Sequence, residues 1–162
     1  MGNSYSDFKI IDVTPTLHGS EYASGDLLFN KQEIPNAVLG NGGCSKLVSL
    51  VVNSKKAVDI DIVVFLITNN QSIGGANEAM NISAADGAAA GFLAQCNLVH
   101  GGADLGNFNT IQMKQTDEDN NTLPCLLQAA AGSTSVYFFA STTTVQTYAS
   151  ADLTFRFGIQ LK

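Results

Sequence analysis

The chain has 162 residues, enough for one domain with a hydrophobic core that needs no disulfide. Charged residues make up 14% of it, against roughly 25% in an average soluble protein, and the net charge is −6. There is a single arginine and no basic cluster longer than Lys55-Lys56, which argues against a nucleic-acid partner and against an anionic membrane surface. Low charge combined with abundant Asn, Ser, Thr, Ala and Gly suits a surface that lies against neighbouring molecules.

Alternation of apolar and polar residues with a period of two predicts β-strands along most of the chain. The last expected strand, DLTFRFGIQLK, shows the pattern most clearly, because its apolar residues all fall on one face. Gly- and Asn-rich segments, which favour turns, separate the runs. The expected strands in chain order are 8–13, 26–30, 46–53, 58–67, 92–99, 108–113, 123–128, 134–141 and 152–162.

Three segments between these strands carry further expectations. The short turn 54–57 predicts that the strands before and after it form a hairpin. The second of these strands ends in the run VVFLI, which is apolar on both faces and indicates a central or covered strand. The segment 68–79 is expected to be a long polar loop that carries contacts. Residues 83–91 form the one helix candidate, with Ser83 as its N-cap.

The pattern as a whole predicts an all-β fold, an antiparallel β-sandwich or a jelly-roll-like barrel of about nine to ten strands with at most one short helix. Residues 21–162 are expected to form a single β domain. Residues 1–20 are treated as an N-terminal segment that could form an arm.

Two similar stretches, EYASGDLLF at 21–29 and TYASADLTF at 147–155, stand near the two ends of the chain. Each places Ser and Asp directly before an expected strand. Short polar side chains at such places bond to the local backbone and close a turn. We therefore interpret both stretches as turns that start a strand, in preference to catalytic Ser–Asp pairs.

Acidic residues suggest two further sites, and both have a simpler interpretation. Asp117, Asp119 and Asn121 match the first ligands of a calcium-binding loop, but Thr122 replaces its glycine, its last acidic ligand is missing, and no helices are expected beside it. A solvated loop is the preferred interpretation. Asp59 and Asp61 share one face of an expected strand. Without a partner group, they are interpreted as its wet face.

The cysteines and histidines form no recognisable catalytic or metal-binding motif. Cys44, Cys96 and Cys125 are odd in number and widely spaced, so a zinc site or a disulfide framework is not expected and a reducing compartment at synthesis fits best. A nucleophilic Cys44 would need His18 or His100 as its base, and nothing in the sequence brings either close. The two histidines also lack the fixed spacing of a metal site.

The remaining candidates are a glycine-rich segment and the tyrosines. GNGGCSK, at 40–46, lacks the spacing of a phosphate-binding loop and is interpreted as a flexible turn. No catalytic, cofactor-binding or metal site is therefore predicted, and the chain is not expected to be an enzyme. Exposed tyrosines could stack on sugars, the candidates being Tyr5, Tyr22, Tyr137 and Tyr148.

Several short motifs in the chain resemble those of head decoration (cement) proteins of tailed bacteriophages, in particular the marine and cyanobacterial phage type. They begin with Tyr22-Ala23-Ser24-Gly25-Asp26 and Ile34-Pro35-Asn36-Ala37, and a glycine-rich turn and the apolar runs LVSLVV and VDIDIVVFLI follow. Further matches are Ile82-Ser83-Ala84-Ala85-Asp86, Leu123 to Leu127 and Ala149-Ser150-Ala151-Asp152-Leu153. The resemblance covers most of residues 20–162.

The resemblance implies a structural virion protein, made in the host cytoplasm, that binds the major capsid protein on the outer surface of the head and stabilises the assembled shell. It implies self-association, commonly as a trimer, and no catalytic residue, cofactor or metal. The alternative is a host-recognition or carbohydrate-binding β module of a phage knob, fibre or tail.

Overall fold

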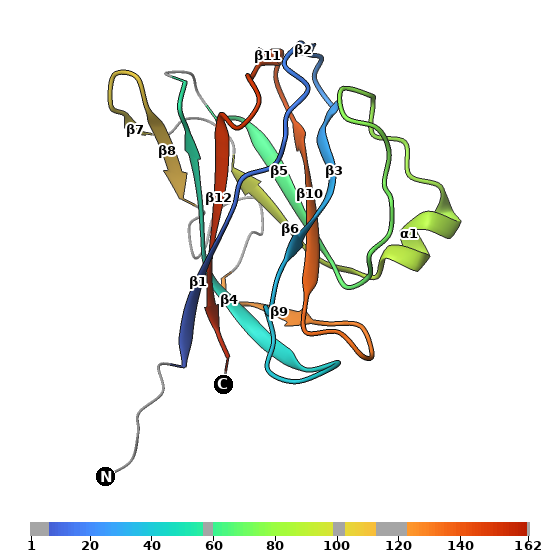
Figure 1. Cartoon of the computed structure of the whole chain (residues 1–162). Helices are drawn as coiled ribbons and strands as arrows, with labels where there is room; N and C mark the ends of the chain where they lie inside the picture. Colours follow the sequence, from blue (N-terminus) through green and yellow to red (C-terminus); the bar gives the residue numbers. More distant parts are fainter. Residues whose placement is uncertain (1–6, 57–59, 99–102, 113–122, 162) are drawn as a thin grey trace.

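The computed structural model describes residues 7–56, 60–98, 103–112 and 123–161 (Figure 1). Two antiparallel sheets pack face to face over these ranges, with a small two-stranded sheet at one end. The first sheet contains β1 (Phe8–Val13), β12 (Leu153–Gln160), β4 (Cys44–Ser54), β8 (Asn109–Gln112), β7 (Ala103–Asp104) and β9 (Cys125–Gln128). The second sheet contains β3 (Leu27–Ile34), β10 (Val136–Thr142), β5 (Ile62–Ile67) and β6 (Phe92–Leu98), and the small sheet contains β2 (Glu21–Tyr22) and β11 (Gln146–Thr147).

The strand order is that of a jelly roll. The first sheet runs β1-β12-β4, and β8 and β9 then pair with successive halves of β4, so that together they occupy one strand position. The second sheet runs β3-β10-β5-β6. Numbered along the chain, the eight strand positions are ordered 1-8-3-6 and 2-7-4-5, which makes a double-sheet jelly roll.

The expected all-β sandwich is confirmed, and the described residues contain one short helix, in agreement with the expectation of at most one. Nine of the described strands have four or more residues and three have two, and the segment 8–13 forms β1 as expected. The helix α1 (Ala84–Ala90) begins at Ser83, whose Oγ accepts a hydrogen bond from the amide of Asp86 at 3.1 Å. Gly91, in the left-handed conformation, ends the helix.

The predicted hairpin between the strands at 46–53 and 58–67 is wrong. These strands, β4 and β5, lie in different sheets, and β4 pairs with β12, β8 and β9. β5 pairs with β10 and β6 instead. A period of two identifies a strand and its buried face but not its partner, and here the chain crosses between the sheets where the sequence suggests a tight turn.

The N-terminal segment contributes to the sandwich. β1 pairs with β12 along its whole length, from Phe8 opposite Gln160 to Val13 opposite Phe155. Residues 8–13 therefore form an edge strand of the first sheet. The expected boundary at residue 21, with residues 1–20 as a possible arm, is therefore wrong for residues 8–13, which belong to the β domain. Residues 1–6 lie outside the described ranges.

The core lies between the sheets and is held by aromatic contacts that cross from one to the other. Phe138 of β10 packs against Phe155 and Phe157 of β12, with ring centroids 5.2 and 4.8 Å apart. Phe29 of β3 packs edge-on against Phe138 and Phe155. All four side chains are almost completely buried. Burial of this apolar area supplies the main driving force for docking the two sheets.

A second, smaller core covers the outer face of the second sheet. The helix α1 and the segment between β5 and β6 lie across this face, on the right of Figure 1. Ile73 of that segment is buried, and its amide donates to Asn30 Oδ1 at 3.1 Å. Phe139 stacks on Phe65 beneath it, with centroids 4.8 Å apart. The prediction of a covered strand at VVFLI is thus confirmed, and the segment 68–79 is polar but held against the sheet.

Candidate functional site

The two YAS stretches form matching turns at one end of the sandwich. In the first, the amide of Ala23 donates to Asp26 Oδ2 at 2.8 Å, and in the second the amide of Ala149 donates to Asp152 Oδ2 at 2.6 Å. The amide of each aspartate returns a bond to the carbonyl of the same alanine at 3.1 Å. Each carboxylate is therefore occupied in closing its own turn, which confirms the structural interpretation.

These turns lie close together because β2 pairs with β11. Tyr22 and Tyr148, the first matching residues of the stretches, are fully buried with ring centroids 6.4 Å apart. The hydroxyl of Tyr22 accepts from the amide of His18 and donates to the carbonyl of Leu28. Burial is the main cause that raises the pKa of Tyr148 to about 12. The two tyrosines thus belong to the core.

The tyrosine platform suggested for sugar stacking is not present at these positions. Tyr22 and Tyr148 are buried, and Tyr137 is half-buried within the second core. Tyr5 lies outside the described residues. The expectation of exposed tyrosines is therefore wrong for two of the four. Both precede an alternating run, and the alternation of a strand does not predict whether the residues before it are buried.

The structure does not bring Cys44 and His18 together. Cys44 is exposed at the start of β4, whereas His18 lies beside Tyr22 near the opposite end of the sandwich. Along β4 the two ends are about 30 Å apart, at about 3.3 Å per strand residue. His100 lies outside the described ranges. No Cys–His arrangement for nucleophilic catalysis exists among the described residues.

The predicted acidic sites are largely outside the described part of the chain. Asp59, Asp117, Asp119 and Asn121 all fall in the ranges that are not described. Asp61 is described, and its backbone carbonyl accepts the amide of Thr143 at 2.9 Å. Within the described residues, no group of three or more His, Cys, Asp or Glu side chains could hold a metal ion.

The glycine-rich segment 40–46 makes a turn, as expected. The amide of Gly43 donates to the carbonyl of Gly40 at 3.1 Å, and the amide of Gly42 donates to the carbonyl of Ser133 at 2.8 Å. Its backbone groups are used within the turn and against the segment before β10. Cys44 and Lys46 then begin β4.

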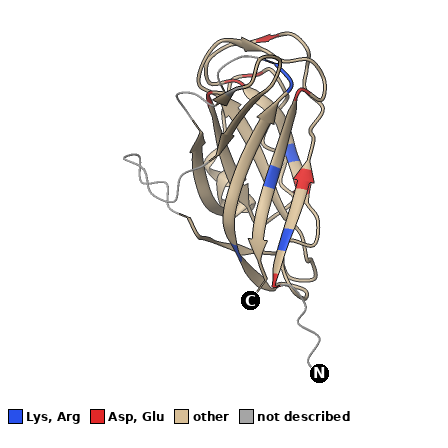
Figure 2. Ribbon diagram, turned by 90° about the vertical axis from the view of Figure 1, so that its left-hand side faces the viewer, with Lys and Arg blue, Asp and Glu red and all other residues tan. Residues whose placement is uncertain are grey.

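The feature that stands out is the outer face of the first sheet, which no other described element covers (Figures 1 and 2). Its outward side chains follow from the strand register and form four rows, which we call the open face. The rows are Phe8, Gln160, Lys46 and Leu126; Ile10, Gly158 and Ser49; Asp12, Arg156, Val51 and Gln112; and Thr154, Asn53, Thr110 and Ala103.

Three large apolar side chains are exposed on the open face. Phe8 is 60% exposed, Ile10 68% and Leu126 57%. Gly158 lies between the Ile10 and Ser49 positions, and a Cβ on it would come within 2.9 Å of the Ser49 Cβ. The centre of the face is therefore flat, with bulky apolar groups beside it.

Charge is sparse on the open face, as Figure 2 shows. The rows contain two basic residues and one acidic residue. Arg156 donates to both carboxylate oxygens of Asp12, from Nε and Nη2, at 2.8 Å each. This hydrogen bonding lowers the pKa of Asp12 below its ordinary value of 3.8. Lys46 is thus the one charge of the rows without an ion-pair partner among the described residues.

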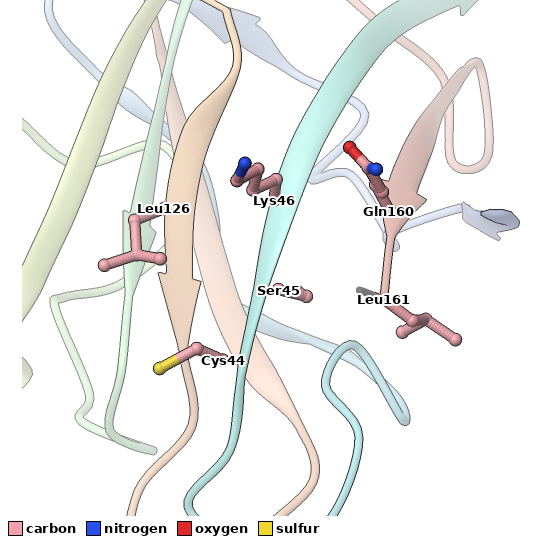
Figure 3. A pocket seen from close by; sticks show the side chains of 6 residues that line it. All are labelled: Cys44, Ser45, Lys46, Leu126, Gln160 and Leu161. Carbon is pink, nitrogen blue, oxygen red and sulfur yellow. The ribbon is translucent and has the colours of Figure 1, made fainter. Parts of the chain in front are cut away.

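A shallow cavity of about 150 Å³ interrupts the lower part of this face (Figure 3). It lies where the ends of β4, β9 and β12 meet, and Lys46, Leu126 and Gln160 are three of its lining residues. The cavity is smaller than the roughly 300–1,000 Å³ of typical small-molecule sites. Cys44, Ser45 and Leu161 complete its lining, and no carboxylate or histidine is among these residues.

Comparison with protein-family models, with curated proteins and with solved structures finds no match to this chain. The helix α1, with seven residues, is much too short to cross a membrane, and no other helix occurs among the described residues. The candidate functional site is the open face.

Proposed function

We propose that the chain is a structural virion protein that binds the outer surface of an assembled phage head through its open face and stabilises the shell. The observation that carries the proposal is the contrast between the two outer faces of the sandwich. One is covered by the chain's own helix and loop, and the other exposes Phe8, Ile10 and Leu126.

The composition of the open face supports a protein partner. Exposed apolar groups gathered on one surface are typical of interaction sites, and the centres of protein interfaces are poor in charge. The open face has three charged residues, and two of them neutralise each other. A partner that covers it would release water from apolar side chains without desolvating many ions.

The fold supports the proposal at a coarser level. Double-sheet jelly rolls are used in viral capsid domains, and also in lectins and cupins. A fold alone does not assign a function, so the argument depends on the surface and on the resemblance of the sequence motifs to phage decoration proteins. Both are consistent with a major capsid protein as partner and with self-association as a trimer.

The stabilising effect follows from mass action. A protein that binds assembled capsomers and does not bind free subunits shifts the equilibrium toward the shell. Each copy that bridges neighbouring capsomers adds to this shift. In a trimer, binding of one subunit raises the effective concentration of the other two at their own sites, which strengthens binding further. Neither step requires a chemical reaction.

The alternative function is recognition of a host glycan by a phage knob, fibre or tail. The jelly-roll fold is compatible with it. Sugar binding usually needs exposed aromatic rings, and Tyr22 and Tyr148 are buried. The aromatic ring on the open face, Phe8, shares its face of β1 with the exposed Ile10, which favours a protein surface over a sugar.

The proposal is tested by counting copies on purified particles and by changing the open face. Mass spectrometry of particles should find hundreds of copies per head, whereas a handful at the tail would favour the alternative. The double variant Ile10→Asp, Leu126→Asp places two carboxylates on the face, which would lose their hydration when a partner covers them. We therefore expect its affinity for shells that lack the protein to fall at least about tenfold.

Val145→Asp is the matched control. Val145 is 60% exposed, like the residues of the open face, but lies beside β11 at one end of the sandwich. This variant should bind shells like the unchanged protein, and all variants should keep the same circular dichroism spectrum. If the double variant bound shells as tightly as the control, the open face would not be the capsid-binding surface.

A further inference from the structure

Two of the three cysteines face each other from opposite sheets. In β6, Cys96 and Leu98 are buried, whereas Asn97 between them is half-buried. In β9, Leu127 is buried and the neighbouring Leu126 is exposed, so Cys125, two residues before Leu127, also points inward. The fold brings these thiols together although they are 29 positions apart in the sequence.

The two strands that carry the thiols, β6 and β9, contact each other across the sandwich. Cys96 belongs to the main core cluster and Cys125 packs against it, so the two thiols lie within hydrogen-bonding reach of each other. β6 is one of the two edge strands of the second sheet, and β9 pairs with β4 at the margin of the first. The contact therefore lies at a side of the sandwich. There the two sheets are held together by side-chain packing and not by backbone hydrogen bonds between strands.

We propose that Cys96 and Cys125 are a modification site, at which oxidation forms a disulfide that joins the two sheets. The proposal does not depend on the capsid function. It also departs from the expectation that the cysteines would remain unpaired, because spacing along the chain does not show which inward positions meet across a sandwich.

The reaction with a small disulfide such as glutathione disulfide balances without any other reactant. The Cys125 thiolate attacks one glutathione sulfur and expels a glutathione thiolate, which leaves a mixed disulfide. Cys96 then loses its proton, attacks the Cys125 sulfur and expels the second glutathione. Two S–H bonds of the protein become one S–S bond, and glutathione disulfide is reduced to two thiols.

The surroundings assign these roles to the two thiols. Cys125 is partly exposed, so a small oxidant can reach it, whereas Cys96 is fully buried. The hydrogen bond from Cys96 lowers the pKa of Cys125, which favours its thiolate. The same hydrogen bond and burial raise the pKa of Cys96, so Cys96 reacts second.

The test uses Cys44→Ser protein, which removes the exposed thiol and leaves the pair unchanged. Incubation of the folded protein with glutathione disulfide should lower its mass by two hydrogen atoms, and peptide mapping should join the Cys96 and Cys125 peptides. The melting temperature should rise by about 5–10 °C, because the crosslink closes a long loop in the unfolded chain.

Single replacements separate the two roles. With Cys96→Ala, Cys125 should retain one glutathione as a stable adduct, whereas with Cys125→Ala the buried Cys96 should remain unmodified. The proposal is overturned if the folded protein keeps both thiols free under conditions that oxidise the urea-unfolded chain. It is equally overturned if glutathione accumulates on Cys125 of the intact pair and no crosslink forms.

Discussion

The two outer faces of the sandwich are built from similar strands but have opposite environments. Behind β5 and β10, Phe65 and Phe139 stack on each other and are covered by α1 and the segment that contains Ile73. On the other side, Ile10 and Leu126 stand on β1 and β9 with no described element over them. Apolar groups on the covered face of the second sheet stabilise the fold, and those on the open face of the first sheet are available to a partner.

This contrast also separates stability from binding. A side chain that is already buried contributes to the free energy of unfolding, and its loss creates a cavity. A side chain that is mostly exposed contributes little to folding and gains its apolar burial when a partner covers it. The same substitution to alanine should therefore have different consequences on the two faces.

The largest expected effect is at Phe139. Phe139→Ala should reduce the free energy of unfolding by about 3–5 kcal/mol, because a fully buried ring is removed from between β10 and the covering segment. Ile10→Ala is its counterpart on the open face and should change stability by less than about 0.5 kcal/mol. Urea denaturation measures both. Equal losses in the two variants would show that the faces do not differ as described.

The next effect concerns the turns that lead into one strand of each sheet. Asp26→Ala, before β3, and Asp152→Ala, before β12, should each cost roughly 0.5–2 kcal/mol, because each loses a hydrogen bond from a backbone amide to the carboxylate. Chemical denaturation of the two single variants is the measurement. If Asp26→Ala were fully stable, its carboxylate would not be holding the turn.

A smaller effect distinguishes the same two turns. The third residue of each has a positive φ, 91° at Gly25 and 64° at Ala151. Alanine is strained there, so Ala151→Gly should raise stability by up to about 1 kcal/mol after the entropy cost of glycine is deducted. Gly25→Ala should do the reverse. A destabilised Ala151→Gly protein would contradict the strain inferred from φ.

Much of the covered face could be predicted from the sequence. The run VVFLI is apolar at consecutive positions, which requires burial on both sides of a strand. The Ser83 cap and the glycine after α1 marked the only described helix. What could not be predicted is that the polar segment 68–79 would use Ile73 as its anchor, since one apolar residue gives no periodicity.

The open face was harder to predict because β1 has apolar residues on both sides. In FKIIDV, alternation can bury either Phe8 and Ile10 or Ile11 and Val13. The structure buries Ile11, and pairing with β12 places Phe8 and Ile10 outward. Which face of β1 is buried depends on the strand that pairs with it. The wrong hairpin between β4 and β5 shows that strand pairing could not be predicted from the sequence.

The smallest effect is expected at the ion pair on the open face. Hydrogen bonds from Arg156 lower the pKa of Asp12, and the attraction between their charges adds to this. A lowered pKa means that the ionised carboxylate stabilises the folded state. This contribution is present above the unfolded pKa near 4 and is lost as pH falls through the lowered value.

Asp12→Asn removes this contribution. The unchanged protein should therefore be slightly more stable than the variant at neutral pH, and the difference should vanish in acid, once the pH has fallen below the lowered pKa of Asp12. Both side chains are substantially exposed, at 50% and 43%, so added salt should also shrink the difference. Urea denaturation at several pH values measures it. A difference that grew on acidification would mean that the pair does not stabilise the fold, and its place on the open face would then be explained by the partner alone.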